Sequence, residues 1–249
     1  MQQDYKTMNE KKMLNKSKGF TLVEMSIVLV VIGIILGAVS VGKDLQRNAA
    51  YQKISQSFVQ GWALAYQSYY TRVNVVIADN QTSPTLRVNG VTIPAPPALP
   101  PATLTAICGG DLQTVMDAAG VQMPAGRAEG SEDTYVYLDT NGNPQQVSVC
   151  FQNRPWSVDG LNTNTYMLRN KNVMVISGLT PDLARLLDNS VDGIADARFG
   201  FFRESQYANN LTVNRRVWSK TNTQNFANAN VNQDESQVAI LTAYYLMPE

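Results

Sequence analysis

An unbroken apolar segment, Phe20–Gly42, constrains the fold of this chain more than any other feature of its 249 residues. It holds 23 residues, and Glu24 is its one charged residue. As a helix it would be about 34 Å long at ~1.5 Å per residue, enough to cross a hydrocarbon core of ~30 Å. Five lysines in residues 1–19 favour a cytoplasmic location for the preceding end. The segment therefore predicts a single membrane helix at residues 20–42, with the rest of the chain outside the cytoplasm.

Two other interpretations of this segment are weaker. A cleaved secretory signal would find small residues at Ala38–Ser40, but the apolar run exceeds the roughly 7–15 residues of a typical signal core. A plain membrane anchor explains the length equally well. Only Glu24 and its surroundings argue against a plain anchor.

Beyond Gly42 the chain keeps a helical period. Apolar or aromatic residues recur at Leu45, Tyr51, Ile54, Phe58, Trp62, Ala65 and Tyr69. From Tyr51 the steps are three or four residues, which is the spacing of one helix face, and no proline occurs from Phe20 to Thr71. We therefore predict one helix of about 50 residues. Its second half, residues 43–75, is amphipathic and should pack on a folded domain.

The composition argues against an enzyme and against a nucleic-acid-binding protein. The charges of the 20 basic and 20 acidic residues cancel, so the chain has no excess of positive charge with which to bind nucleic acid. Histidine is absent, which removes the commonest general base and the commonest metal ligand. Two cysteines alone do not make a zinc site. Carboxylates could serve glycoside hydrolysis, but no pair stands at a spacing that singles it out.

The junction before the apolar segment resembles a known processing signal. Its residues are Lys18-Gly19-Phe20-Thr21-Leu22-Val23-Glu24. They resemble the prepilin cleavage and methylation signature of type IV pilins and type II secretion pseudopilins, and the likeness extends over roughly residues 16–45. The resemblance implies a leader peptide at residues 1–19, cleavage between Gly19 and Phe20 by prepilin peptidase, and N-methylation of Phe20.

The resemblance also implies an architecture and a role. The expected fold is α+β, with the long N-terminal helix packed on an antiparallel β-sheet head. The expected function is that of a structural subunit of a type IV pilus or pilus-like filament. Before assembly its single helix would lie in the inner membrane and its head in the periplasm; after assembly it would belong to a periplasmic or cell-surface filament. Its partners would be prepilin peptidase and other pilin subunits.

Three features depart from many pilins. The helix lacks a proline, the 19-residue leader is long, and the 230 residues from 20 to 249 are many for a major pilin. The last feature favours a minor or specialised subunit. A type II secretion pseudopilin and a ligand-binding adhesin at a filament tip are the alternatives.

Glu24 is the residue that we assign to assembly. A carboxylate inside a bilayer is costly and usually has a partner. Cleavage after Gly19 would create an α-amino group on Phe20, four residues away. The Phe20 ammonium of one subunit could then neutralise Glu24 of its neighbour and set the axial register of the filament. The alternative is that Glu24 lies near the lipid headgroups, within reach of water.

The remaining chain predicts a proline-rich loop followed by a β-rich head. Residues 76–105 form the loop, with six prolines from Pro84 to Pro101, and residues 106–249 form the head. The predicted strands form hairpins Thr134–Leu138 with Gln146–Phe151 and Thr165–Arg169 with Val173–Ser177, followed by Arg198–Arg203, Thr212–Ser219 and Val238–Leu246. The predicted helices are Asp111–Ala119 and one that Thr180 caps and that ends near Ser190–Gly193.

The two cysteines predict a disulfide. Cys108 and Cys150 lie 42 residues apart, and an oxidising space outside the inner membrane would favour their pairing. Such a bond would tie the loop region to the sheet. Two buried free thiols are the alternative.

A calcium site is the one cofactor prediction. Asp188, Ser190, Asp192 and Asp196 place oxygen side chains at relative positions 1, 3, 5 and 9 of an EF-hand-like loop, and the carbonyl of Ile194 would serve at position 7. Position 12 should be a bidentate Glu but is Phe199. A helix end followed by a turn explains the same residues and is the favoured interpretation.

Overall fold

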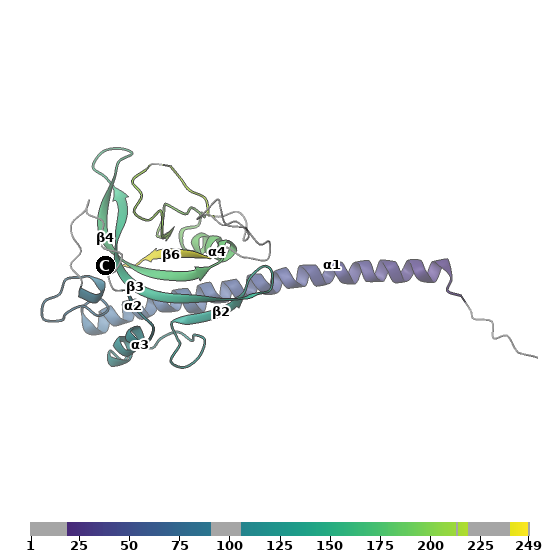
Figure 1. Ribbon diagram of the computed structural model, residues 1–249, viewed down its shortest axis with the longest axis horizontal. Coiled ribbons are helices and arrows are strands. Elements are labelled where there is room, and N and C mark those ends of the chain that lie inside the picture. The colour runs from purple at the N-terminus through teal and green to yellow at the C-terminus, as the bar shows by residue number, and fades with distance from the viewer. Residues whose placement is uncertain (1–18, 91–105, 213, 219–239, 249) are drawn as a thin grey trace, which may run out of the picture. The chain divides into compact units, whose positions relative to one another are not determined.

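The computed structural model describes residues 19–90, 106–212, 214–218 and 240–248. The chain divides into two compact units, Met1–Leu45 and Gln46–Glu249, the second of which is the head. Within the head, an antiparallel sheet lies beside helix α2 (Gln60–Val73; Figure 1).

One long helix begins the described chain. It comprises α1 (Leu22–Lys53), a π-helical turn (Ile54–Val59) and α2 (Gln60–Val73). Together these make 52 helical residues, which confirms the predicted length. By length and composition the helix can cross a membrane. It ends where Asn74 adopts a left-handed φ of 59° and donates its N–H to the carbonyl of Tyr70.

One face of this helix packs into the main core of the head. Its buried hydrophobic side chains are those of Tyr51, Ile54, Phe58, Val59, Trp62, Ala65, Tyr66 and Tyr69. Tyr66 stacks on Phe151 of the sheet at 5.4 Å between ring centroids. Leu45, which precedes the regular steps that begin at Tyr51, is 66% exposed. Six residues separate Leu45 from Tyr51, and at about 100° per residue they do not share a face.

The sheet of the head is antiparallel throughout its described strands. These are β1 (Ile107–Cys108), β2 (Thr134–Leu138), β3 (Pro144–Asp159), β4 (Tyr166–Leu179), β5 (Phe202–Glu204) and β6 (Leu241–Leu246). Their order is β1-β3-β4-β6-β5, and β2 also pairs with β3. The pairing of Thr134 with Ser148 through Leu138 with Pro144 confirms the first predicted hairpin.

Alternation along the strands gives the sheet two faces. Phe151, Met174 and Ala243 point toward the helix and belong to the main core. Trp156 and Tyr244 point to the opposite, outer face, where they form a smaller apolar cluster with Val173 and Ala208. The helix therefore covers one face, while the outer face has its own small cluster.

The second predicted hairpin is wrong. Residues 170–172 are not a turn, because β4 continues through them and pairs with β3 along its whole length. The real connection is the loop from Gly160 to Thr165, where Gly160 donates its N–H to the carbonyl of Thr165. Asn172 is fully buried in mid-strand. Its Oδ1 accepts from Asn153 Nδ2 (2.7 Å) and from the N–H of Val88 (3.1 Å).

The predicted helices of the head are confirmed. Helix α3 spans Gly109–Ala118, and α4 spans Pro181–Asp192. Thr180 caps α4 by accepting from the N–H of Leu183 at 3.4 Å, and Gly193 ends it with a left-handed φ of 78°.

The later strands are confirmed only in part. Of the predicted strand Arg198–Arg203, only Phe202 and Arg203 lie in β5. None of the described residues of the predicted strand Thr212–Ser219 lies in a strand. The described part of the last predicted strand, Val238–Leu246, is confirmed as β6, whereas residues 238 and 239 lie outside the described residues.

The chain after the helix is irregular over residues 76–87. Asp79 organises it, because its Oδ2 accepts from the N–H groups of Thr85 and Leu86, both at 2.8 Å. A short 3-10 turn follows at Val88–Gly90. Residues 91–105 lie outside the described residues.

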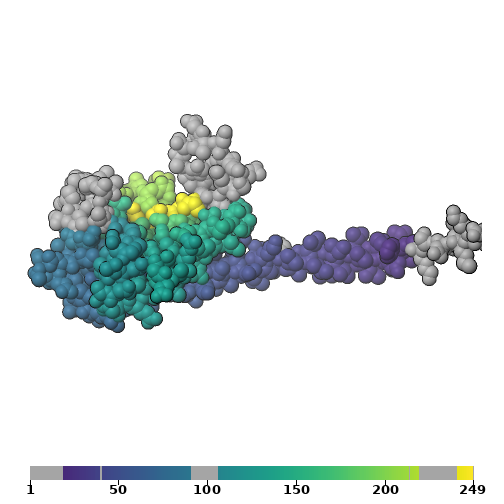
Figure 2. Space-filling view, turned by 60° about the horizontal axis from the view of Figure 1, so that its bottom comes forward, coloured from purple at the N-terminus to yellow at the C-terminus, as the bar shows by residue number. Residues whose placement is uncertain are grey.

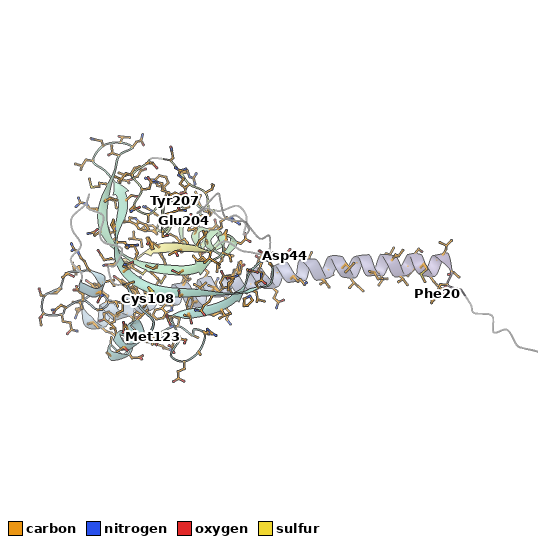
Figure 3. The ribbon with its side chains drawn as sticks, in the orientation of Figure 1. Phe20, Asp44, Cys108, Met123, Glu204 and Tyr207 are labelled. Carbon is orange, nitrogen blue, oxygen red and sulfur yellow. A yellow bond between two sulfur atoms is a disulfide. The ribbon has the colours of Figure 1, made fainter. Side chains whose placement is uncertain are left out.

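Cys108 and Cys150 form a disulfide, as predicted. They are direct partners in the pairing of β1 with β3. Because α3 begins at Gly109, the bond fixes the start of this helix to β3; Cys108 is labelled in Figure 3.

Candidate assembly site

The predicted processing junction, Gly19–Phe20, lies just before α1. The Phe20 side chain is 80% exposed and is labelled at the end of the drawn helix in Figure 3. A Cβ placed on Gly19 would meet no atom within 4 Å. The fold of this chain therefore makes no demand for glycine at position 19, so a requirement for glycine there would come from whatever binds the junction.

Glu24 and Thr21 close the first turn of α1 with a reciprocal set of hydrogen bonds. Glu24 Oε2 accepts from the backbone N–H of Thr21 (2.8 Å) and from its hydroxyl (3.0 Å). In return, Thr21 Oγ1 accepts from the N–H of Glu24 (3.2 Å). This is a capping box, in which a Thr and the Glu three residues later each satisfy a free N–H group. The Thr-x-x-Glu spacing is visible in the sequence, and our sequence analysis missed it.

The capping box gives Glu24 a role within its own chain. The negative carboxylate lies at the helix N-terminus, where the helix dipole favours it. Only Oε2 is engaged, because the described residues provide no hydrogen bond to Oε1. The geometry therefore leaves one oxygen able to accept a cation without loss of the cap.

The residues of the predicted calcium loop occupy the end of α4 and the turn after it. Asp188 Oδ2 accepts from the N–H of Asp196 (2.6 Å) and from Trp218 Nε1 (2.5 Å). Asp192 accepts from the N–H groups of Phe201 and Phe202, both at 2.9 Å. These carboxylates thus join α4 to the segments that follow it in the chain.

The other members of the loop do not converge with these carboxylates. Asp196 accepts from Arg215 Nε at 2.7 Å. The Ser190 hydroxyl donates to the carbonyl of Leu187 and lies 3.0 Å from Ser55 Oγ, and Ile194 is exposed. In the part of the chain that the structure describes, no three His, Cys, Asp or Glu side chains are grouped as a metal would need. Calcium binding here stays a prediction, which calorimetry with calcium would test.

Two of these carboxyl groups have pKa values shifted in opposite directions. Burial raises the pKa of Asp188 to about 7, and the charge of nearby Asp192 acts in the same direction. Burial would also raise the pKa of Asp196, but hydrogen bonds from Arg215 and from two backbone N–H groups lower it overall. Asp188 is therefore half protonated near neutral pH while Asp196 is ionised.

Comparison with known proteins identifies only the N-terminal part of the chain. Residues 14–40 match the family described as the prokaryotic N-terminal methylation motif, and they include Gly19, Phe20 and Glu24. No curated protein and no solved structure matches the chain. The chain thus carries a prepilin-type signal, which is typical of type IV pilins and type II secretion pseudopilins, followed by a pilin-like α+β fold.

Proposed function

We propose that this chain is a structural subunit of a type IV pilus or pilus-like filament. The methylation motif at residues 14–40 carries the proposal, because it coincides with the start of an apolar helix that continues into the head. Prepilin peptidase cleaves between Gly19 and Phe20, and Phe20 is then N-methylated. Before assembly, the mature chain lies in the inner membrane with its head in the periplasm. It then assembles into the filament by packing of its N-terminal helix.

The apolar side chains of α1 support assembly through this helix. From Leu22 to Val41 they are exposed in the single chain, for example Leu29 at 69% and Leu36 at 66%. In the membrane, lipid covers such side chains. A subunit that leaves the membrane must bury them against other apolar surfaces, and the same helices of neighbouring subunits provide these.

Glu24 sets the register of this packing. The ammonium group of the mature Phe20 of one subunit binds the carboxylate of Glu24 in its neighbour, so that two charges in an apolar surrounding neutralise each other. The free Oε1 of Glu24 supports the pairing, since a cation can bind there while Oε2 keeps its bonds to Thr21.

A type II secretion pseudopilin is the second candidate, because the same motif is typical of both classes. The two differ in the machine that uses the subunit. A strain lacking the chain would lose a surface filament in the first case and the export of folded proteins in the second. The 230 residues of the mature chain favour a minor or specialised subunit in either machine.

Mass spectrometry of the protein purified from its membrane tests the proposal. We expect the chain to begin at Phe20 and to carry one methyl group on its α-amino nitrogen. Replacement of Gly19 by Leu should leave the full-length precursor in the membrane, although the fold tolerates a side chain at this position. A native chain with an intact Met1, or one that begins near Val41, would refute the proposal.

A further inference from the structure

Acidic side chains gather at one edge of the head. From Gly109 to Asp133 the sequence holds five acidic residues and a single basic one, Arg127. Gln113 of α3 donates to Asp133 at 3.3 Å, so α3 and the loop after it lie together. Asp111, Asp117 and Glu129 are exposed, and Glu132 is partly exposed. These four residues form the acidic edge.

A group of basic side chains lies in the half of the β3–β4 ribbon that leads to the loop from Gly160 to Thr165. Arg154 is paired directly with Lys171, and Trp156 with Arg169, so these four side chains share the outer face of the sheet. Between residues 152 and 172 the only acidic residue is Asp159. Arg154, Arg169 and Lys171 are the basic ribbon.

Two members of the basic ribbon have no acidic partner within the described residues. Arg154 instead donates to the hydroxyl of Tyr244 (2.9 Å), and Arg169 is exposed. A third guanidinium, that of Arg203, lies 4.2 Å above the ring of Trp156.

The acidic edge and the basic ribbon lie on opposite sides of the head. In Figure 1 the ribbon of β3 and β4 rises above the rest of the sheet, whereas α3 lies below α2. Figure 2 turns the lower side toward the reader and brings the teal segment with α3 and β2 into the foreground. The two patches therefore cannot meet within one head, but they can meet between two heads.

We propose that the basic ribbon of one copy of this chain docks on the acidic edge of the next copy. A contact between two different patches leaves one of each free at the ends of any row of copies, so it propagates into an open array unless the rotation between copies closes the row into a ring. The inference rests on the proposed filament and deepens it. At this contact, two copies of this chain stand next to each other in the filament.

Reversal of charge in the full-length chain tests this contact. We expect Arg169→Glu and Glu129→Arg each to lower the yield of sheared filaments at least about tenfold, which corresponds to ~1.4 kcal/mol at one contact. The double variant Arg169→Glu, Glu129→Arg should recover most of the yield, because the two patches exchange their charges. As a control, Arg216→Glu makes the same change at an exposed arginine that belongs to neither patch.

A second measurement records the contact itself. Arg169→Cys and Glu129→Cys in one chain should give a ladder of disulfide-linked copies, whereas either single variant should give at most dimers. Wild-type yield from Arg169→Glu, a double variant no better than the single ones, or a ladder that never forms would each overturn the contact. If the wild-type protein still forms filaments and carries a methylated Phe20, each of these three results would refute the contact but not the proposed function. If the wild-type protein forms no filaments and lacks the methylated Phe20, the proposed function itself would be rejected.

Discussion

At the scale of single residues, Glu24 has two tasks that can be separated. It closes the capping box with Thr21, and it is proposed to bind the ammonium group of a neighbouring subunit. A capping box accepts Gln as well as Glu, because either side-chain oxygen can accept the N–H bond. The pairing of charges accepts only Glu. Substitution by Gln therefore keeps the first task and removes the second.

We expect Glu24→Gln to leave the helix, membrane insertion and cleavage unchanged but to abolish most filament formation. Immunoblots of the membrane and of the sheared fraction would measure both. Thr21→Ser, which keeps the hydroxyl and the charge of Glu24, is the matched control and should assemble normally. Wild-type filament yield from Glu24→Gln would remove the argument for charge pairing.

Asp188 makes the stability of the head depend on pH. Burial raises its pKa in the folded state to about 7, above its ordinary value of 3.8. The neutral acid therefore stabilises the folded chain fully below pH 3.8, and this contribution is lost as the pH rises through about 7. The carboxyl group cannot be exchanged for an apolar one, because Oδ2 accepts two hydrogen bonds.

We expect Asp188→Asn to be more resistant to heat than the wild-type protein at pH 8, and the difference to shrink toward pH 5. The amide imitates the neutral acid and can still accept from Asp196 and Trp218. Thermal unfolding of the detergent-solubilised chain, followed by tryptophan fluorescence, would measure this. If the melting temperatures of the two proteins change in parallel between pH 5 and pH 8, Asp188 does not titrate in this range.

At the scale of elements, local patterns in the sequence predicted most of the helices and one hairpin. The long helix, α3, α4 and the β2–β3 hairpin all follow from periodicity, caps or turn residues within a short window. The continuity of β4 through Asn172 depends on contacts far away in the chain. The buried side-chain amide of Asn172 forms hydrogen bonds with Asn153 and with Val88. No local pattern in the sequence predicts that an Asn-Lys-Asn segment will form these hydrogen bonds.

The candidate site shows the same division. The processing junction, Glu24 and the cysteine pair were predicted from short motifs and composition. The hydrogen bonds that Asp188 accepts from Asp196 and Trp218 were not predicted. Trp218 lies 30 residues after Asp188, and their hydrogen bond forms only in the folded head. The three-residue spacing of Thr21 and Glu24 was available and was overlooked in favour of the intermolecular role.

The disulfide should hold the shortest strand in place. Strand β1 has only two residues, and its pairing with β3 joins Cys108 to Cys150. Closure of a loop of this length contributes about 4 kcal/mol in the chain-entropy model. We expect the Cys108→Ala, Cys150→Ala double variant to lose about this much unfolding free energy in urea. Hydrogen exchange should show the largest loss of protection in β1 and α3, and an unchanged midpoint would contradict a stabilising role.

At the scale of the whole molecule, the chain consists of a membrane unit and a head with its own core. The main core lies between residues 51 and 247 and, among the residues that the structure describes, includes no side chain before Gln46. The part of the helix that packs on the sheet, from Tyr51 onward, belongs to the head. The apolar segment is thus unnecessary for the packing of the head, whereas the second half of the same helix is indispensable.

A chain that begins at Gln46 should therefore fold without detergent, as a monomer with the disulfide formed and a cooperative thermal transition. A chain that begins at Gln60 is the control, because it also lacks the membrane unit but loses the buried side chains of Tyr51, Ile54 and Phe58. Large buried side chains contribute about 2–5 kcal/mol each, and a whole domain is stable by only about 5–15 kcal/mol, so the control should not fold. Circular dichroism and size-exclusion chromatography would distinguish the two chains. Aggregation of the chain from Gln46, or cooperative folding of the chain from Gln60, would show that the boundary between membrane unit and head lies elsewhere.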